Sequence, residues 1–252
     1  MTETSEDGFL GGVLRIRQPA RGYRAGADAV MLAASCPAMA GQRVLELGCG
    51  AGVASLCLGW RVSGLHLAGL ERQADYAALA RENAAANDIA LQVHLGDLAA
   101  MPAALRAESF DHVIANPPYF LNGTAARDKG RATARQEMTP LPIWLDAALR
   151  RLRPDGIITL IQRVERLPTI VSSLQGRAGD MCVLPLSSRA GREAGRVIVT
   201  ARKGARGPLR LLNPLVIHSA PGHLRDGEDL GPTASAVLRG GAPLTPLFAK
   251  VP

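Results

Sequence analysis

The sequence predicts an α/β protein built around one mostly parallel, doubly wound sheet. Between Arg43 and Leu174, short apolar segments alternate with helical ones at a spacing that favours parallel strands joined by right-handed crossovers. A glycine-rich turn, Gly48-Cys-Gly-Ala-Gly52, follows the first of these strands directly. The last two predicted strands are joined by a connection too short for a crossover helix, so we expect them to pair antiparallel.

Seven apolar segments form the predicted sheet, and their ranges are 43–47, 65–70, 89–95, 110–115, 157–161, 181–186 and 196–201. Predicted helices cover 29–36, 53–58, 76–86, 141–152 and 167–174. The Arg153-Pro-Asp-Gly156 stretch is expected to be a turn that stops the helix before it. Proline and glycine become frequent after Lys203, which predicts loops with a short strand at 215–218 and a helix at 233–238.

The whole chain, 1–252, is predicted to form a single domain with a basic N-terminal arm (1–40), a core (41–202) and a Pro/Gly-rich extension (203–252). In the arm, residues 13–17 alternate between apolar and cationic side chains, which indicates a short strand with one positively charged face. Asp28 is a candidate N-cap for the helix that follows it.

The chain carries 29 basic and 22 acidic residues, which gives a formal net charge of +7. This excess favours an anionic partner such as nucleic acid, although a solvated basic surface would give the same composition. Four scattered cysteines without a C-x-x-C pair argue against a zinc site or a disulfide framework and favour a reducing compartment. With no signal peptide and no apolar run of about 20 residues, we expect a cytoplasmic protein with neither a membrane span nor a metal.

The stretch Asn116-Pro-Pro-Tyr119 ends the fourth predicted strand and is the strongest functional signal in the chain. Each proline restricts the residue before it to an extended conformation, so Asn116 should stand at the carboxyl end of its strand. The Asn116 amide oxygen and the Pro117 carbonyl can accept the two hydrogens of a planar NH₂ group while the Tyr119 ring stacks on it. Taken alone, the same four residues would also suit an ordinary turn.

Polar or glycine residues also end the first three strands, at Glu46 to Gly52, at Glu71 and at Gly96-Asp97. Ligands of open α/β sheets bind at the carboxyl ends of the strands, so the fold should gather these groups on one edge. A nicotinamide enzyme would show a similar glycine turn followed by an acid about 20 residues later. The combination with Asn-Pro-Pro-Tyr favours a different chemistry.

With these motifs the chain resembles the class I S-adenosylmethionine-dependent methyltransferases over about residues 20–200. The resemblance implies their Rossmann-like fold, a mostly parallel seven-stranded sheet with a C-terminal antiparallel pair. It also implies S-adenosylmethionine as cofactor, with the residues of Glu46-Leu-Gly48-Cys-Gly50-Ala-Gly52 under its methionine part. Glu71 would hold its ribose hydroxyls and Asp97 its adenine amino group. Asn116, Pro117 and Tyr119 would be catalytic, and the motif would direct the methyl group to an amino or amide nitrogen.

Within that superfamily the chain most resembles the bacterial tRNA1(Val) adenine-37 N6-methyltransferases. The segment Gly22-Tyr-Arg-Ala-Gly-Ala-Asp28 carries this resemblance, which implies that it closes over the cofactor with Tyr23, Asp28 and Asn116 near it. The implied partner is a tRNA. The candidate residues for gripping RNA phosphates are the cations of the arm and of one basic loop: Arg15, Arg17, Arg127, Lys129, Arg131 and Arg135.

Three other functions fit parts of this pattern. Glutamine N5-methyltransferases share Asn-Pro-Pro-Tyr but usually carry a helical domain ahead of the catalytic one, and only about 40 residues precede the first strand here. Guanine N2-methyltransferases of ribosomal RNA typically have Phe in place of Tyr and often a duplicated domain. A module that binds the cofactor and RNA without catalysis would not need an intact Asn116 and Tyr119.

Overall fold

The computed structural model describes residues 3–119, 139–220 and 229–249. Its centre is a nine-stranded sheet with the order β10-β8-β9-β7-β6-β3-β4-β5, and β11 pairs with β8 off this path. The strands are β3 (Arg43–Leu47), β4 (His66–Glu71), β5 (Leu91–Leu95), β6 (Phe110–Ala115), β7 (Leu152–Arg163), β8 (Ala178–Arg189), β9 (Ala194–Lys203), β10 (Arg210–Leu211) and β11 (Leu215–His218). Strands β3 to β9 are the seven predicted ones, and β10 and β11 extend the sheet at the β8 edge.

The pairing of the strands confirms the predicted topology. Strands β3, β4, β5, β6 and β7 are parallel to one another, whereas β9 runs antiparallel to both β7 and β8. The expected turn at 153–156 is wrong, because these residues lie inside β7, which begins as soon as helix α6 (Leu141–Arg151) ends. The register of β6 and β7 shifts between Phe110 and His112, and Asp155 has a φ of 60°, so the irregularity is absorbed within the strand.

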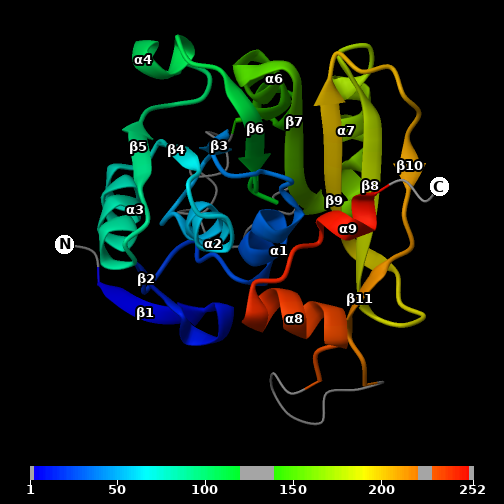
Figure 1. Cartoon of the computed structure of the whole chain (residues 1–252), viewed down its shortest axis with the longest axis horizontal. Helices are drawn as coiled ribbons and strands as arrows, with labels where there is room; N and C mark the ends of the chain where they lie inside the picture. The colour runs from blue at the N-terminus through cyan, green and yellow to red at the C-terminus, as the bar shows by residue number, and fades with distance from the viewer. Residues whose placement is uncertain (1–2, 120–138, 221–228, 250–252) are drawn as a thin grey trace, which may run out of the picture.

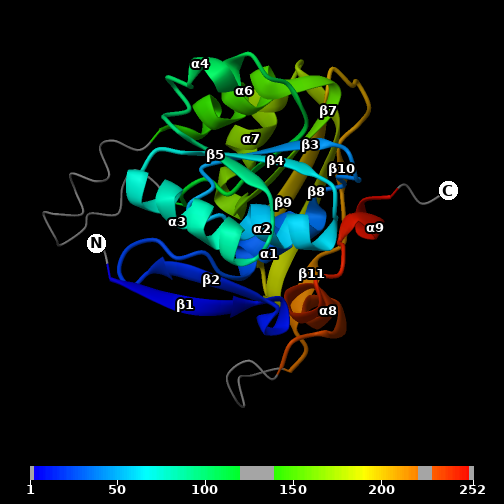
Figure 2. The ribbon, with the colours of Figure 1, turned by 60° about the vertical axis from the view of Figure 1, so that its left-hand side comes forward.

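Helices cover both faces of the sheet (Figures 1 and 2). One face carries α1 (Ala27–Ser35), α2 (Val53–Arg61) and α8 (Pro232–Gly240), and α3 (Ala74–Ala86) packs beside β5. The other face carries α6 and α7 (Leu167–Leu174), with the short α4 (Ala103–Arg106) near them. A separate buried cluster of apolar side chains fills each face, so the sheet lies between two cores.

The N-terminal arm forms a two-stranded antiparallel sheet of its own from β1 (Thr4–Phe9) and β2 (Leu14–Pro19), joined by the 3-10 turn η1 (Leu10–Gly12). The cationic strand around 13–17 is thus present, whereas β1 was not expected from its polar sequence. Asp28 is not an N-cap, because α1 begins one residue earlier, its N-cap residue is Gly26 and no side chain caps it. Within the described residues, no helix is both long enough and apolar enough to cross a membrane.

Candidate active site at the carboxyl edge of the sheet

The carboxyl ends of β3, β4, β5, β6 and β7 define one side of the sheet, called here the carboxyl edge. The turn after β3 requires its glycines, because Gly48, Gly50 and Gly52 all have positive φ, at 66°, 54° and 89°. A Cβ atom on Gly48 would also lie 2.5 Å from the Trp144 ring. The backbone N–H groups of Gly48 and Cys49 both donate to the Leu70 carbonyl, at 2.7 and 3.1 Å, which fixes the turn against β4.

Two buried carboxylates brace this turn. Glu46 accepts hydrogen bonds from the Ser55 backbone N–H (2.9 Å) and hydroxyl (2.5 Å), which ties β3 to α2. Burial raises the pKa of Glu46 to about 8, although the Ser55 bonds oppose the shift. Glu71 accepts from the N–H of Gly50 at 3.0 Å and from that of Gln73 at 2.8 Å. Glu71 therefore holds the glycine turn from the neighbouring strand while lying at the carboxyl edge.

Asp97 follows the next strand, β5, and is partly exposed. One of its carboxylate oxygens accepts the N–H of Ala99 at 2.8 Å, which closes a tight turn beyond the strand. Gly96, directly before it, packs closely against Pro102, since a Cβ atom there would lie 2.6 Å from the proline ring. The predicted acid therefore stands at a fixed place on the carboxyl edge, next to the strand that ends in Glu71.

Each group of the Asn116-Pro-Pro-Tyr119 loop is held by a different residue. The Asn116 side-chain NH₂ donates to the Tyr23 hydroxyl at 3.2 Å. The Pro117 carbonyl accepts from Nε2 of Gln162 on β7, at 3.1 Å. The Tyr119 hydroxyl donates to Oδ2 of Asp28 at 2.5 Å. The amide oxygen of Asn116 and one lone pair of the Pro117 carbonyl remain as acceptors.

Asp28 links three distant parts of the sequence. Its second carboxylate oxygen forms an ion pair with Arg196, at the start of β9. Burial raises the pKa of Tyr119, and the negative charge of Asp28 raises it further. Burial likewise raises the pKa of Tyr23 to about 12, with Glu46 and Asp28 adding to the shift. Both phenols are therefore protonated at neutral pH, and the Tyr119 hydroxyl proton is the one donated to Asp28.

The segment that leads from β2 into α1 crosses the carboxyl edge. The Tyr23 carbonyl accepts the hydroxyl of Tyr76 on α3 at 2.8 Å, and the Tyr23 ring approaches the position that a Cβ of Gly50 would take, at 3.9 Å. The structure thus brings Tyr23, Asp28, the glycine turn and Asn116 to Tyr119 together, as expected from the sequence. Within the described residues, no group of three or more His, Cys, Asp or Glu side chains could hold a metal ion.

Two contact residues were not predicted. Gln162 is a buried polar residue that directly follows an apolar strand segment, and this placement was the only sequence signal for it. Arg196 could not be found from sequence, because its partner Asp28 lies 168 positions away. The remaining predicted residues lie farther out: Arg15 is on the hairpin, paired with Glu6 at 2.9 Å, and Arg17 is on the same strand. The loop cations Arg127, Lys129, Arg131 and Arg135 lie outside the described residues.

The polar groups at the carboxyl edge fit S-adenosylmethionine. Glu71 and Asp97, at neighbouring strand ends, provide acceptors for hydroxyl and amino groups. The glycine turn lets the backbone approach a ligand closely at the start of α2. Together with the doubly wound sheet, this site defines a class I S-adenosylmethionine-dependent methyltransferase.

Comparison with known proteins agrees. The chain belongs to the family described as the methyltransferase small domain, whose model matches residues 26–174. It is 31% identical over 209 residues to a tRNA1(Val) (adenine(37)-N6)-methyltransferase of Aeromonas hydrophila subsp. hydrophila, covering 81% of this chain and 86% of that protein. An enzyme of the same name from Actinobacillus succinogenes is 30% identical over 184 residues, covering 71% of this chain and 77% of the relative.

Solved structures show the same fold. An Agrobacterium tumefaciens protein described as a predicted O-methyltransferase superposes with a TM-score of 0.70 at 26% identity, covering 86% of this chain and 97% of that one. A 16S rRNA N2 methyltransferase of T. thermophilus, solved with AdoMet and guanosine, gives a TM-score of 0.57 at 19% identity. It covers 80% of this chain and 50% of that one. The protein is therefore an S-adenosylmethionine-dependent methyltransferase.

Proposed function

We propose that the protein methylates the exocyclic N6 amino group of an adenine in tRNA, at position 37. The observation that carries this proposal is the way three separate contacts fix the Asn116-Pro-Pro-Tyr119 loop while leaving its acceptors available. The relatives named as tRNA1(Val) adenine-37 N6-methyltransferases, which match most of the chain, support the choice of substrate.

We propose that the residues of the carboxyl edge divide the work of holding the cofactor. The glycine turn, Gly48 to Gly52, lies beneath its methionine part, Glu71 binds the ribose hydroxyls and Asp97 binds the adenine amino group. Tyr23 and Asp28 cover the bound cofactor from the crossing segment. Glu46 acts on the cofactor site through Ser55 and the start of α2, because its own carboxylate is buried and bonded there.

The cofactor supplies an electrophilic methyl group on a sulfonium. The lone pair of an adenine amino group is spread into its ring, so this nitrogen is a poor nucleophile. In our proposal Asn116 Oδ1 and the Pro117 carbonyl accept the two amino hydrogens and localise the lone pair. The Tyr119 ring, held through its hydroxyl, stacks on the base. Placement, more than a strong base, then provides the rate.

The RNA substrate is anionic, so its binding needs cations beyond the loop that holds the base. We propose that Arg15 and Arg17 on the N-terminal hairpin contact RNA phosphates, together with Arg127, Lys129, Arg131 and Arg135. The Arg15–Glu6 pair is highly exposed, so it exchanges readily for a phosphate contact. We also place the activity in the cytoplasm, where the four described cysteines, all buried and free, would remain thiols.

The test is to incubate the protein with an unmodified tRNA transcript and cofactor labelled in its methyl group, and then to digest the RNA to nucleosides. We expect the label in N6-methyladenosine. Label in N2-methylguanosine, or only in glutamine of an added protein, would show that a different amine is the substrate.

A further inference from the structure

The carboxyl edge is a poor place to bind RNA phosphates. Its centre carries the carboxylates of Asp28, Glu71 and Asp97, which suit hydroxyl and amino donors but repel a phosphate backbone. Two of the described cations near it are already in ion pairs, Arg196 with Asp28 and Arg163 with Glu165, and Arg166 lies beside Arg163. Part of the electrostatic attraction for the RNA phosphates must therefore come from cations elsewhere on the protein.

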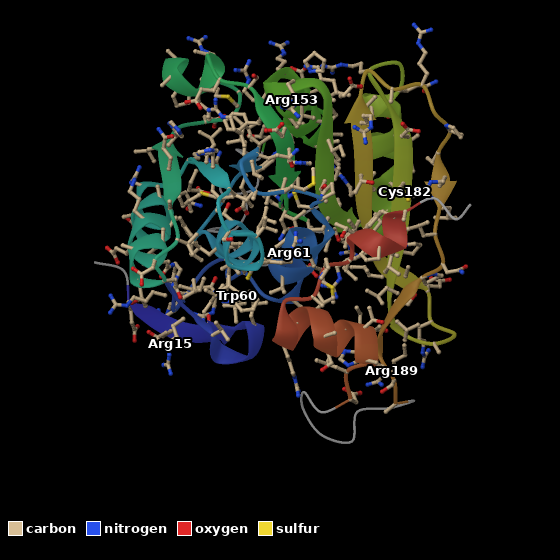
Figure 3. The ribbon with its side chains drawn as sticks, in the orientation of Figure 1. Arg15, Trp60, Arg61, Arg153, Cys182 and Arg189 are labelled. Carbon is tan, nitrogen blue, oxygen red and sulfur yellow. The ribbon has the colours of Figure 1, made fainter. Side chains whose placement is uncertain are left out.

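The opposite side of the sheet, where the parallel strands begin, is called here the amino edge. Five cations gather there, and we name them the amino-edge cluster: Arg106, Arg150, Arg151, Arg177 and Lys203. Figure 3 shows nitrogen-tipped side chains projecting from this edge, where Arg153 is labelled. Asp146 is the carboxylate that these cations share, paired with Arg150 at 2.8 Å and with Arg177 at 2.9 Å.

The cluster is held together by the backbone it surrounds. An Arg151 guanidinium nitrogen donates to the carbonyls of Leu105 and Glu108, at 3.1 and 3.2 Å, and the Lys203 ammonium donates to the Leu152 carbonyl at 2.5 Å. Burial and the nearby charges of Arg150 and Arg106 lower the pKa of Arg151. Lys203 is affected in the same way by burial and by Arg151 and Arg177. These cations therefore repel one another within one patch.

Three of the neighbouring carboxylates have a cation of their own outside the cluster. Glu108 pairs with Arg43, Asp111 with Arg153, and Asp180 lies 4.0 Å from Arg202. The cluster itself holds five cations against the single carboxylate of Asp146, so it is strongly positive. The side chains are accessible: those of Arg150 and Arg177 are 71% and 45% exposed.

Helices α6 and α7 connect this patch to the carboxyl edge. Both lie on the same face of the sheet, packed side by side (Figure 2). Helix α7 begins beyond the end of β7, next to Arg163 and Arg166, and ends just before Arg177. The six-residue β6 spans about 20 Å from one edge to the other, so a single RNA can reach both.

We propose that the amino-edge cluster binds the phosphate backbone of the RNA substrate at a point distant from the methylated base. This inference rests on the proposed function, since it assigns the same RNA a second contact surface. The cluster contributes affinity independent of sequence, whereas the carboxyl edge selects the base.

The test is RNA binding at a series of salt concentrations, with an unmodified tRNA transcript and no methyl transfer. The double variant Arg106→Gln/Arg150→Gln removes two exposed cations of the cluster. We expect its tRNA affinity to fall at low salt and the slope of log K against log salt to decrease by about two. Affinity for S-adenosylhomocysteine should stay at the wild-type value.

Two control variants make the result decisive. Arg106→Lys/Arg150→Lys keeps both charges and should keep the wild-type slope. Arg239→Gln removes an exposed arginine from α8, on the other face, and should leave the slope nearly unchanged. A double Gln variant with the slope of Arg239→Gln would overturn the inference, even if the enzyme methylates tRNA normally. If the wild-type protein instead bound no RNA, the proposed function itself would fail.

Discussion

At the scale of single residues, Asp28 fixes the side chain of Tyr119, which we propose stacks on the base. It accepts the Tyr119 hydroxyl and pairs with Arg196, and its side chain is 14% exposed. Asp28→Asn weakens the charge-assisted hydrogen bond from the Tyr119 hydroxyl, which is worth roughly 1.5–3 kcal/mol. We therefore expect kcat/KM for tRNA to fall about tenfold to a hundredfold.

A double-mutant cycle distinguishes this role from a general loss of stability. Tyr119→Phe removes the hydroxyl and keeps the ring, so it should reproduce much of the Asp28→Asn effect on tRNA. The double variant should then be little worse than either single variant. Fully additive losses in kcat/KM would contradict a shared role for these two residues.

Glu71 is the residue that we propose binds the ribose of the cofactor. Glu71→Ala removes the acceptor that we propose for the ribose hydroxyls and also frees the Gly50 N–H. We expect the affinity for S-adenosylhomocysteine to drop by roughly 1.5–3 kcal/mol per lost hydrogen bond, measured by calorimetric titration. Glu82→Ala, an exposed glutamate on α3, is the control and should bind like the wild type. Equal affinities for all three proteins would remove Glu71 from the binding site.

The raised pKa of Glu46 predicts that the free energy of unfolding depends on pH. Its pKa in the folded protein is raised to about 8, above the ordinary value of 4.5, so the folded state binds the extra proton between these values. Its contribution is therefore fully present below about pH 4.5 and is lost as the pH rises through 8. Chemical denaturation at pH 5.5 and 8.5 should show a larger loss of stability for the wild type than for Glu46→Gln, which does not titrate. Identical losses would refute the predicted shift.

At the scale of elements, the glycine turn after β3 is fixed by both conformation and space. Gly48→Ala places a Cβ atom at positive φ and 2.5 Å from the Trp144 ring. Gly41→Ala is a matched control, because Gly41 has a φ of 81° but no atom near its missing Cβ. We expect Gly48→Ala to lower the free energy of unfolding by about 1–3 kcal/mol more than Gly41→Ala, from the overpacking alone. Equal losses in denaturant titrations would show that Trp144 moves aside freely.

Elements with a clear hydrophobic pattern could be predicted from the sequence, and β3, β6, α7 and β11 agree with the expected bounds. The first strand, Thr4–Phe9, could not, because its residues are polar and its structure depends on pairing with β2. The turn expected at Arg153 to Gly156 is instead a bulge within β7, because the pairs on either side of it, Phe110 with Leu152 and His112 with Ile157, continue the strand.

At the scale of the whole molecule, the topology explains why the gathering of most candidate residues at one edge of the sheet could be predicted. The strand order places the ends of β3, β4 and β6 side by side. The proximity of the motifs at those ends can therefore be predicted without knowing how the side chains pack. Contacts made by Gln162 and Arg196 depend on how β7 and β9 align with the loop, which no local pattern reports. The division into an arm, a core and an extension within a single domain stays a prediction.

The amino-edge cluster was missed because its members are spread from Arg106 to Lys203 and form no charge run. The sequence showed the net charge, but the fold decides where that charge gathers. The hairpin and the amino edge, two of the proposed RNA surfaces, lie away from the Asn116 to Tyr119 loop that is proposed to hold the base.

The proposed reaction requires Asn116 to act on the amino group of the substrate rather than on the cofactor. The most direct measurement is the single-turnover rate of methyl transfer from S-adenosylmethionine to unmodified tRNA by Asn116→Ala, at saturating cofactor and RNA. We expect this rate to fall by at least a hundredfold while the affinity for S-adenosylhomocysteine stays within about twofold of the wild type. A near-normal rate would contradict the proposed role of Asn116.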